Sequence, residues 1–114
     1  MSNVSYQTIN SLSEISFIGG SEYTITFNVF DQNGGAANIS GATCSWKMSP
    51  YGEPETVILS YNGTPVGTTA FSITILAADT LALSGKFIHQ PLVVESGKSY
   101  RSQQGIITII PAIN

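Results

Sequence analysis

The chain has 114 residues, a length that predicts one domain able to bury a core without metals or disulfides. Hydrophobic residues make up 42% and charged residues 10%, which excludes a disordered chain because disorder combines high charge with low hydrophobicity. The net charge is −3, and four cations are too few to neutralise a run of phosphates, so we expect no nucleic-acid partner.

The first twelve residues are polar and rich in Ser and Asn. We expect residues 1–12 to form an arm or a loose edge strand, and residues 13–114 to form a single β-sandwich domain. The N-terminus has neither a basic segment nor an apolar segment of signal-peptide type, so we expect no secretory signal. No apolar run approaches the roughly 20 residues of a membrane span, and we expect no membrane partner.

Alternating polarity predicts the first three strands, at residues 14–18, 23–30 and 42–48. In the second, Ile25 and Phe27 alternate with threonines, so one face is expected in a core and the other in water. In the third, Cys44 and Trp46 share one face, and the lone cysteine is expected to be a buried small hydrophobe. An Asn33-Gly34 turn is expected between the second and third strands.

The middle of the chain begins with a loop over residues 49–54, where two prolines and a glycine prevent strand pairing. Residues 56–61 then predict a short strand that ends at Asn62-Gly63, a strong hairpin signal. Residues 69–76 alternate again and predict the next strand.

One short helical turn is expected near residues 79–84, capped by Asp79 and ended by Gly85 in a left-handed conformation. Residues 85–95 and 104–110 predict the last two strands, with a turn at residues 97–99. About seven short strands in this length, with a tryptophan on the third, indicate an all-β, immunoglobulin-like antiparallel β-sandwich. A jelly roll is the main alternative, although it usually needs more strands.

Candidate catalytic and metal-binding residues are sparse. His89 is the only histidine, and we expect it at the surface or at a sheet edge, where it cannot anchor a zinc site by itself. Glu53 and Glu55 form the only close acidic pair and are interpreted as solvated loop charges. Asp31 and Asn33 resemble the opening of a calcium loop, but the acidic closing ligand is missing. We therefore expect no catalytic, cofactor-binding or metal-binding residue, and no enzyme.

Two tyrosines offer an alternative function. Tyr51 and Tyr61 lie in neighbouring predicted loops and could form an aromatic platform for a sugar. The alternative to a structural protein is therefore a carbohydrate-binding β-sandwich module that holds a surface glycan.

Several spaced elements resemble one known family. They are Phe27-x-Val29-x-Asp31-x-x-Gly34, Ile39-Ser-Gly-Ala-Thr43 and Asp79-Thr80-x-x-Leu83-x-Gly85-Lys-Phe87. The pattern, which spans roughly residues 20–111, is similar to the N-terminal domain of the baseplate upper protein family of tailed bacteriophages and to related tail and head accessory proteins. The resemblance implies an immunoglobulin-like module without catalytic residues.

The resemblance also implies a location and partners. It implies a non-enzymatic structural component of a bacteriophage virion, made in the host cytoplasm, either a connector at the tail or baseplate or a capsid decoration or accessory protein. It implies contacts with other virion proteins and with copies of the same chain. A surface with few charges suits a subunit that neighbours cover, although an ordinary extracellular-type β domain has the same composition.

Overall fold

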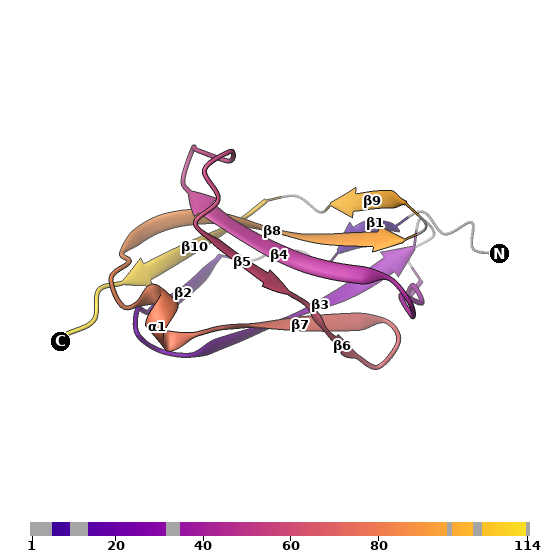
Figure 1. The fold of residues 1–114 in the computed structure, drawn as a ribbon, viewed down its shortest axis with the longest axis horizontal. Coiled ribbons are helices and arrows are strands. Elements are labelled where there is room, and N and C mark those ends of the chain that lie inside the picture. The colour runs from indigo at the N-terminus through magenta and orange to yellow at the C-terminus, as the bar shows by residue number, and fades with distance from the viewer. Residues whose placement is uncertain (1–5, 10–13, 32–34, 96, 102–103, 114) are drawn as a thin grey trace.

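Two β-sheets stack face to face and enclose one hydrophobic core (Figure 1). This computed structural model describes residues 6–9, 14–31, 35–95, 97–101 and 104–113. The sandwich is all-β except for one helical turn, which confirms the predicted fold class. Ten strands lie in the described ranges, where the sequence predicted about seven.

The bounds of the elements are as follows. The strands are β1 (Tyr6–Ile9), β2 (Ile15–Ile18), β3 (Tyr23–Asp31), β4 (Thr43–Pro50), β5 (Leu59–Asn62), β6 (Thr64–Val66), β7 (Ala70–Ile75), β8 (Gly85–Glu95), β9 (Lys98–Arg101) and β10 (Gly105–Ile110). The helical turn, α1, is Ala77–Thr80.

The smaller sheet has four strands in the order β1-β3-β7-β6. Strands β3 and β7 pair antiparallel along their length, with Phe27 opposite Phe71. Both phenylalanines are fully buried and their ring centroids lie 5.3 Å apart, whereas Thr24 and Thr26 face outward. The period-two pattern of residues 23–30 and 69–76 therefore predicted these strands and their core faces correctly.

The larger sheet has the order β2-β10-β8-β4-β5, and β9 also pairs with β8. The 11-residue strand β8 runs beside β4 for most of its length, while its other edge pairs first with β10 and then with β9. Strand β2 joins β10 in parallel. The two strand orders match the immunoglobulin arrangement, with β3, β4 and β8 in the places of strands B, C and F.

The connections between strands differ from those that the local turn signals predicted. The predicted Asn33-Gly34 turn lies outside the described residues, and the strands on either side of it belong to different sheets. The predicted hairpin at Asn62-Gly63 is wrong, because β5 pairs with β4 in the larger sheet and β6 with β7 in the smaller.

Gly63 is where the chain changes sheets, and it lies close to side chains of both. Its backbone N–H donates to the carbonyl of Cys44 on β4 at 2.7 Å. A Cβ atom at this position would lie 2.5 Å from Cδ2 of Phe71 and 2.9 Å from Cβ of Cys44. The glycine therefore allows a close approach between the sheets.

The helical turn and one strand also differ from expectation. Helix α1 spans Ala77–Thr80, earlier than predicted, with Leu76 at its N-cap and no side-chain cap, so Asp79 is not the cap. Gly85 has the expected positive φ of 99°, but it begins β8 rather than ending the helix. Strand β9 was not predicted, because only the turn at residue 97 carried a sequence signal.

The N-terminal strands lie at the edges of the two sheets (Figure 1). Strand β1, within the segment expected to be an arm or edge strand, pairs with β3, and β2 coincides with the strand expected at residues 14–18. The boundary near residue 12 lies outside the described residues and stays a prediction. Among the described residues, no helix is long and apolar enough to span a membrane.

The close approach at Gly63 predicts the effect of one substitution. We expect Gly63→Ala to lower the free energy of unfolding by about 1–3 kcal/mol, because the added methyl group must displace Phe71 or Cys44. Chemical denaturation measures the change. The control Asn62→Ala, at the exposed neighbour, should stay within about 0.5 kcal/mol of the parent. Equal losses in the two variants would contradict the role assigned to Gly63.

Candidate functional site

The outer face of the larger sheet carries a groove of about 230 Å³. Strands β4 and β8 form its floor, Arg101 of β9 and Gln104 just before β10 form one wall, and the loop of residues 51–58 forms the other. We call it the outer-face groove, and it is lined by Ser45, Trp46, Lys47, Ser49, Pro54, Val57, Ile88, His89, Gln90, Leu92, Arg101 and Gln104. The groove is therefore an open cleft with a mixed polar and apolar lining.

The strand register explains which side chains line this groove. Lys47 lies opposite Gln90, and Ser49 lies opposite Ile88, so outward-facing residues of β4 and β8 alternate with core residues. Although they face outward, Ser49 and Ile88 are only 4% and 8% exposed, because the loop of residues 51–58 covers them. The Ser49 hydroxyl donates to the Pro54 carbonyl at 3.3 Å and links the loop to the sheet.

Basic side chains gather on this face. Lys47 and Arg101 line the groove, and Lys86 lies on β8 with its Nζ 5.9 Å from the centre of the Tyr51 ring. These three are all the cations whose side chains the structure describes. No salt bridge links Lys47 or Arg101 to an acid within the described ranges. The outer face of the larger sheet is therefore locally basic in a chain of net charge −3.

The smaller sheet presents the opposite chemistry. On its outer surface, a polar patch that we call the hydroxyl face is formed by Thr24, Thr26, Asn28, Thr64, Ser72 and Thr74. Ala70 and the 46% exposed Val66 share that surface with them. All six polar residues are uncharged, and the hydroxyl groups of Thr24 and Thr74 share a hydrogen bond of 3.0 Å across β3 and β7. The patch is therefore polar without charge, and Val66 adds an exposed apolar group beside it.

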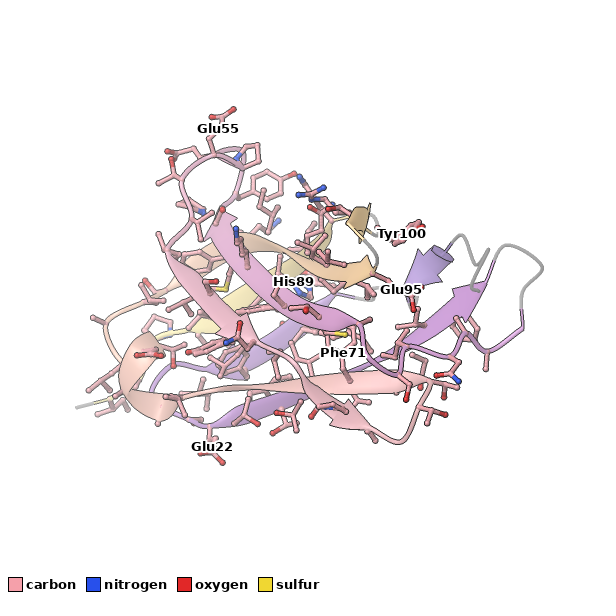
Figure 2. The ribbon with its side chains drawn as sticks, turned by 45° about the vertical axis from the view of Figure 1, so that its right-hand side comes forward. Glu22, Glu55, Phe71, His89, Glu95 and Tyr100 are labelled. Atoms are coloured by element: carbon pink, nitrogen blue, oxygen red, sulfur yellow. The ribbon has the colours of Figure 1, made fainter. Side chains whose placement is uncertain are left out.

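His89 is not at the surface, so the sequence prediction for it is wrong. It is 1% exposed, on the inner face of β8, between the two sheets (Figure 2). Its Nδ1 accepts a hydrogen bond of 2.8 Å from Nε1 of Trp46, and its ring centroid lies 6.4 Å from that of Phe27. The position follows from parity, because His89 is two residues from the buried Phe87 on the same strand face.

The environment of His89 favours the neutral imidazole. Burial lowers the pKa of His89 to about 4. Protonation would turn Nδ1 into a donor facing the Trp46 N–H, which is a donor only. Its Nε2 has no hydrogen-bond partner in the described part of the chain. A buried neutral histidine of this kind is a packing residue, and it borders the outer-face groove from below with only 1% of its surface exposed.

The predicted tyrosine platform is not formed. Tyr61 lies on β5, where its ring stacks on buried Trp46 with centroids 5.7 Å apart. Its hydroxyl donates to the Asp79 carboxylate at 2.5 Å and accepts from the Leu76 N–H at 3.3 Å. Tyr51 instead lies beyond the end of β4 with Lys86 over its ring. The prediction was wrong because β5 turns Tyr61 inward, away from the face that carries Tyr51.

The hydrogen bonds of Tyr61 tie β5 to the helical turn. Burial, followed by the hydrogen bond to Asp79, raises the pKa of Tyr61 to about 12. Asp79, which was expected to cap the helix, therefore has a different role. It accepts a hydrogen bond from the Tyr61 hydroxyl and holds α1 against the sheet edge.

The remaining candidate residues stay apart. Glu53 and Glu55 are exposed in the loop of residues 51–58, as expected for solvated charges. Cys44 is half-buried, and burial raises the pKa of its thiol. The side chain of Asp31 and all of Asn33 lie outside the described residues. Within the described ranges, no three His, Cys, Asp or Glu side chains gather in a way that could hold a metal ion.

Comparisons with known proteins identify the fold. No family model matches the sequence, and no curated protein matches it. Titin domain M7 aligns over 94% of this chain and 95% of its own length, with a TM-score of 0.56 and 16% identity. Domains 4 and 5 of the S-layer protein SbsC align over 95% of this chain and 47% of theirs, with a TM-score of 0.51 and 11% identity. These similarities confirm the immunoglobulin-like sandwich and concern the fold alone.

The buried His89 predicts a pH-dependent stability. Its folded-state pKa of about 4 lies below the ordinary value of 6.5, so between these values the unfolded chain binds the proton more readily. The contribution of the neutral histidine to the free energy of unfolding is therefore fully present above pH 6.5. It falls by about 3 kcal/mol as the pH drops to about 4. Urea denaturation at a series of pH values measures this loss.

The control for this prediction is His89→Gln, which keeps a hydrogen-bond acceptor for Trp46 but does not titrate. Carboxyl groups contribute to both pH profiles, so the difference between parent and variant isolates the histidine. That difference should grow on acidification. Parallel profiles would contradict the buried neutral state of His89.

The Tyr61 hydroxyl predicts a second, smaller effect. Tyr61→Phe keeps the ring that stacks on Trp46 but removes the hydrogen bonds to Asp79 and Leu76. We expect a loss of about 1 kcal/mol in the free energy of unfolding, measured by chemical denaturation. Tyr51→Phe serves as the matched control and should change stability little, because the Tyr51 hydroxyl makes no hydrogen bond to any described residue. A larger loss in Tyr51→Phe would refute the assignment.

Proposed function

We propose that this chain is a non-enzymatic structural subunit of a tailed-bacteriophage virion, acting through protein–protein contacts. The observation that supports the contact role is the uncharged hydroxyl face of the smaller sheet. The assignment to a phage particle rests on the resemblance of the sequence to baseplate and accessory modules. An immunoglobulin-like fold is consistent with an interaction module.

The hydroxyl face suits burial against a neighbouring protein. Covering a charged surface carries a large desolvation penalty, whereas hydroxyl groups that already bond to one another, such as Thr24 and Thr74, need fewer new partners. With 10% charged residues, the chain also generates little repulsion between copies. These properties favour repeated contacts in an assembly.

The site chemistry supports a role without catalysis. The only histidine is buried against Trp46 and neutral, so it is not available as a surface base. The acids Glu53 and Glu55 are exposed in the loop of residues 51–58. The features that remain are surfaces suited to binding.

Within the virion, the proposal places the chain at the tail or baseplate as a connector, or on the head as a decoration or accessory protein. Its partners are other virion proteins and its own copies, and it is made in the host cytoplasm. It binds neither nucleic acid nor a membrane in this role.

The proposal predicts that the protein is a stoichiometric component of purified particles. Quantitative mass spectrometry of gradient-purified virions should find it at a fixed ratio to the major capsid protein, with host cytosolic proteins as the control for carry-over. Cryo-electron microscopy should show a sandwich-sized density in particles made with the gene, and this density should be absent from particles made without it. A protein that is abundant in the lysate but absent from purified particles would overturn the proposal.

A further inference from the structure

We propose that the outer-face groove binds the acidic loop of residues 51–58 from a second copy of this chain, so that two copies form a two-fold symmetric dimer. The inference goes beyond the virion role, because it rests only on the groove and the loop. Both elements lie on the same face of the larger sheet.

The groove supplies positive charge above a floor of mixed polar and apolar residues. Arg101 on β9 lies opposite Leu92 on β8, which in turn lies opposite Ser45 on β4, so one row of residues crosses three strands. Lys47 follows two residues along β4. Two strand spacings, roughly 10 Å, separate β9 from β4. The flexible Lys47 and Arg101 side chains can therefore both reach one carboxylate placed over Leu92.

The loop supplies the complementary charge. Glu53 and Glu55 flank Pro54 and are both exposed, and Glu55 stands at the tip of the loop that rises above the larger sheet (Figure 2). The loop also exposes apolar surface, because Tyr51 and Val57 are 58% and 46% exposed. It therefore offers both carboxylates and apolar groups to a neighbouring molecule.

The arrangement is self-complementary. A two-fold interface brings the same patch of each copy together, so every contact occurs twice. Here an acidic protrusion stands directly beside a basic hollow, and Pro54 and Val57 of the loop form one wall of that hollow. A two-fold axis that passes between loop and groove places each loop in the groove of the other copy.

A second copy fits this groove better than a sugar does. Carbohydrate sites usually present an aromatic face, but Trp46, the aromatic residue bordering the groove, is fully buried with its ring stacked on Tyr61. Complementary acids are already present on the chain, at the same edge of the groove. Because exposed ion pairs are individually weak, the dimer should be weak and sensitive to salt.

Sedimentation equilibrium of the full chain tests the proposal. We expect dimers at about 0.1 M salt and a shift toward monomers at about 1 M, where the Debye length falls from roughly 10 Å to roughly 3 Å. Glu55→Lys alone, or Lys47→Glu with Arg101→Glu, should weaken association at least about tenfold. Mixing these two variants should restore a 1:1 dimer, because residue 55 of each loop then meets a groove of opposite charge.

Glu22→Lys is the matched control for Glu55→Lys, since it makes the same charge change at an exposed acid on the opposite side of the sandwich (Figure 2). It should leave association unchanged. Lys47→Gln with Arg101→Gln gives a neutral version of the groove change, and circular dichroism checks that every variant is folded. The neutral pair should also weaken the dimer.

Three results would overturn the proposal. The first is a parent chain that stays monomeric at low salt. The second is a dimer that the loop and groove variants do not weaken, or that Glu22→Lys weakens equally. The third is a monomer whose groove binds a synthetic Glu-rich peptide or an acidic sugar, which would assign the groove to a different occupant. None of these results bears on whether the chain is present in virions.

Discussion

The hydrogen bond between Trp46 and His89 is the interaction on which the rest of the structure depends. In antibody domains, a tryptophan on strand C packs against a disulfide that joins strands B and F across the two sheets. This chain has one cysteine, on the equivalent of strand C, so that disulfide is impossible. Phe27 of β3, Trp46 of β4 and His89 of β8 meet in its place. The packing of the His89 ring against Phe27 therefore joins the two sheets, and the hydrogen bond from Trp46 holds His89 in place within the larger sheet.

A neutral core leaves the charges to be distributed over the surface, and they are distributed unevenly. The described cations lie on the outer face of the larger sheet, whereas the hydroxyl face of the smaller sheet has none. The two faces thus suit two kinds of contact, one electrostatic and dependent on salt, the other uncharged and dependent on close packing. A subunit with two such faces can contact two different neighbours at once.

The sequence predicted what depends on side-chain periodicity and missed what depends on distant contacts. The alternation of Ile25 and Phe27 with threonines fixed the core face of β3, since neighbouring side chains of a strand point to opposite sides. The sequence prediction misplaced His89 because a lone polar residue suggests exposure. Its position two residues after Phe87 on the same strand indicates the inner face instead. Gly63 carried a hairpin signal, but its true constraint is the approach of Phe71 and Cys44, which no local pattern contains.

The outer-face groove illustrates the same limit. Lys47 and Arg101 are far apart in the sequence, and the row from Ser45 through Leu92 to Arg101 exists only because β9 pairs with the second half of β8. That strand carried no sequence signal, so the basic patch could not be foreseen from residue spacing. Strand β8 is long enough to pair with β10 and then with β9, and this length brings the Arg101 side chain to the same face as Lys47. The groove is therefore a product of strand register, and a shift of β9 by one residue would turn Arg101 to the opposite face.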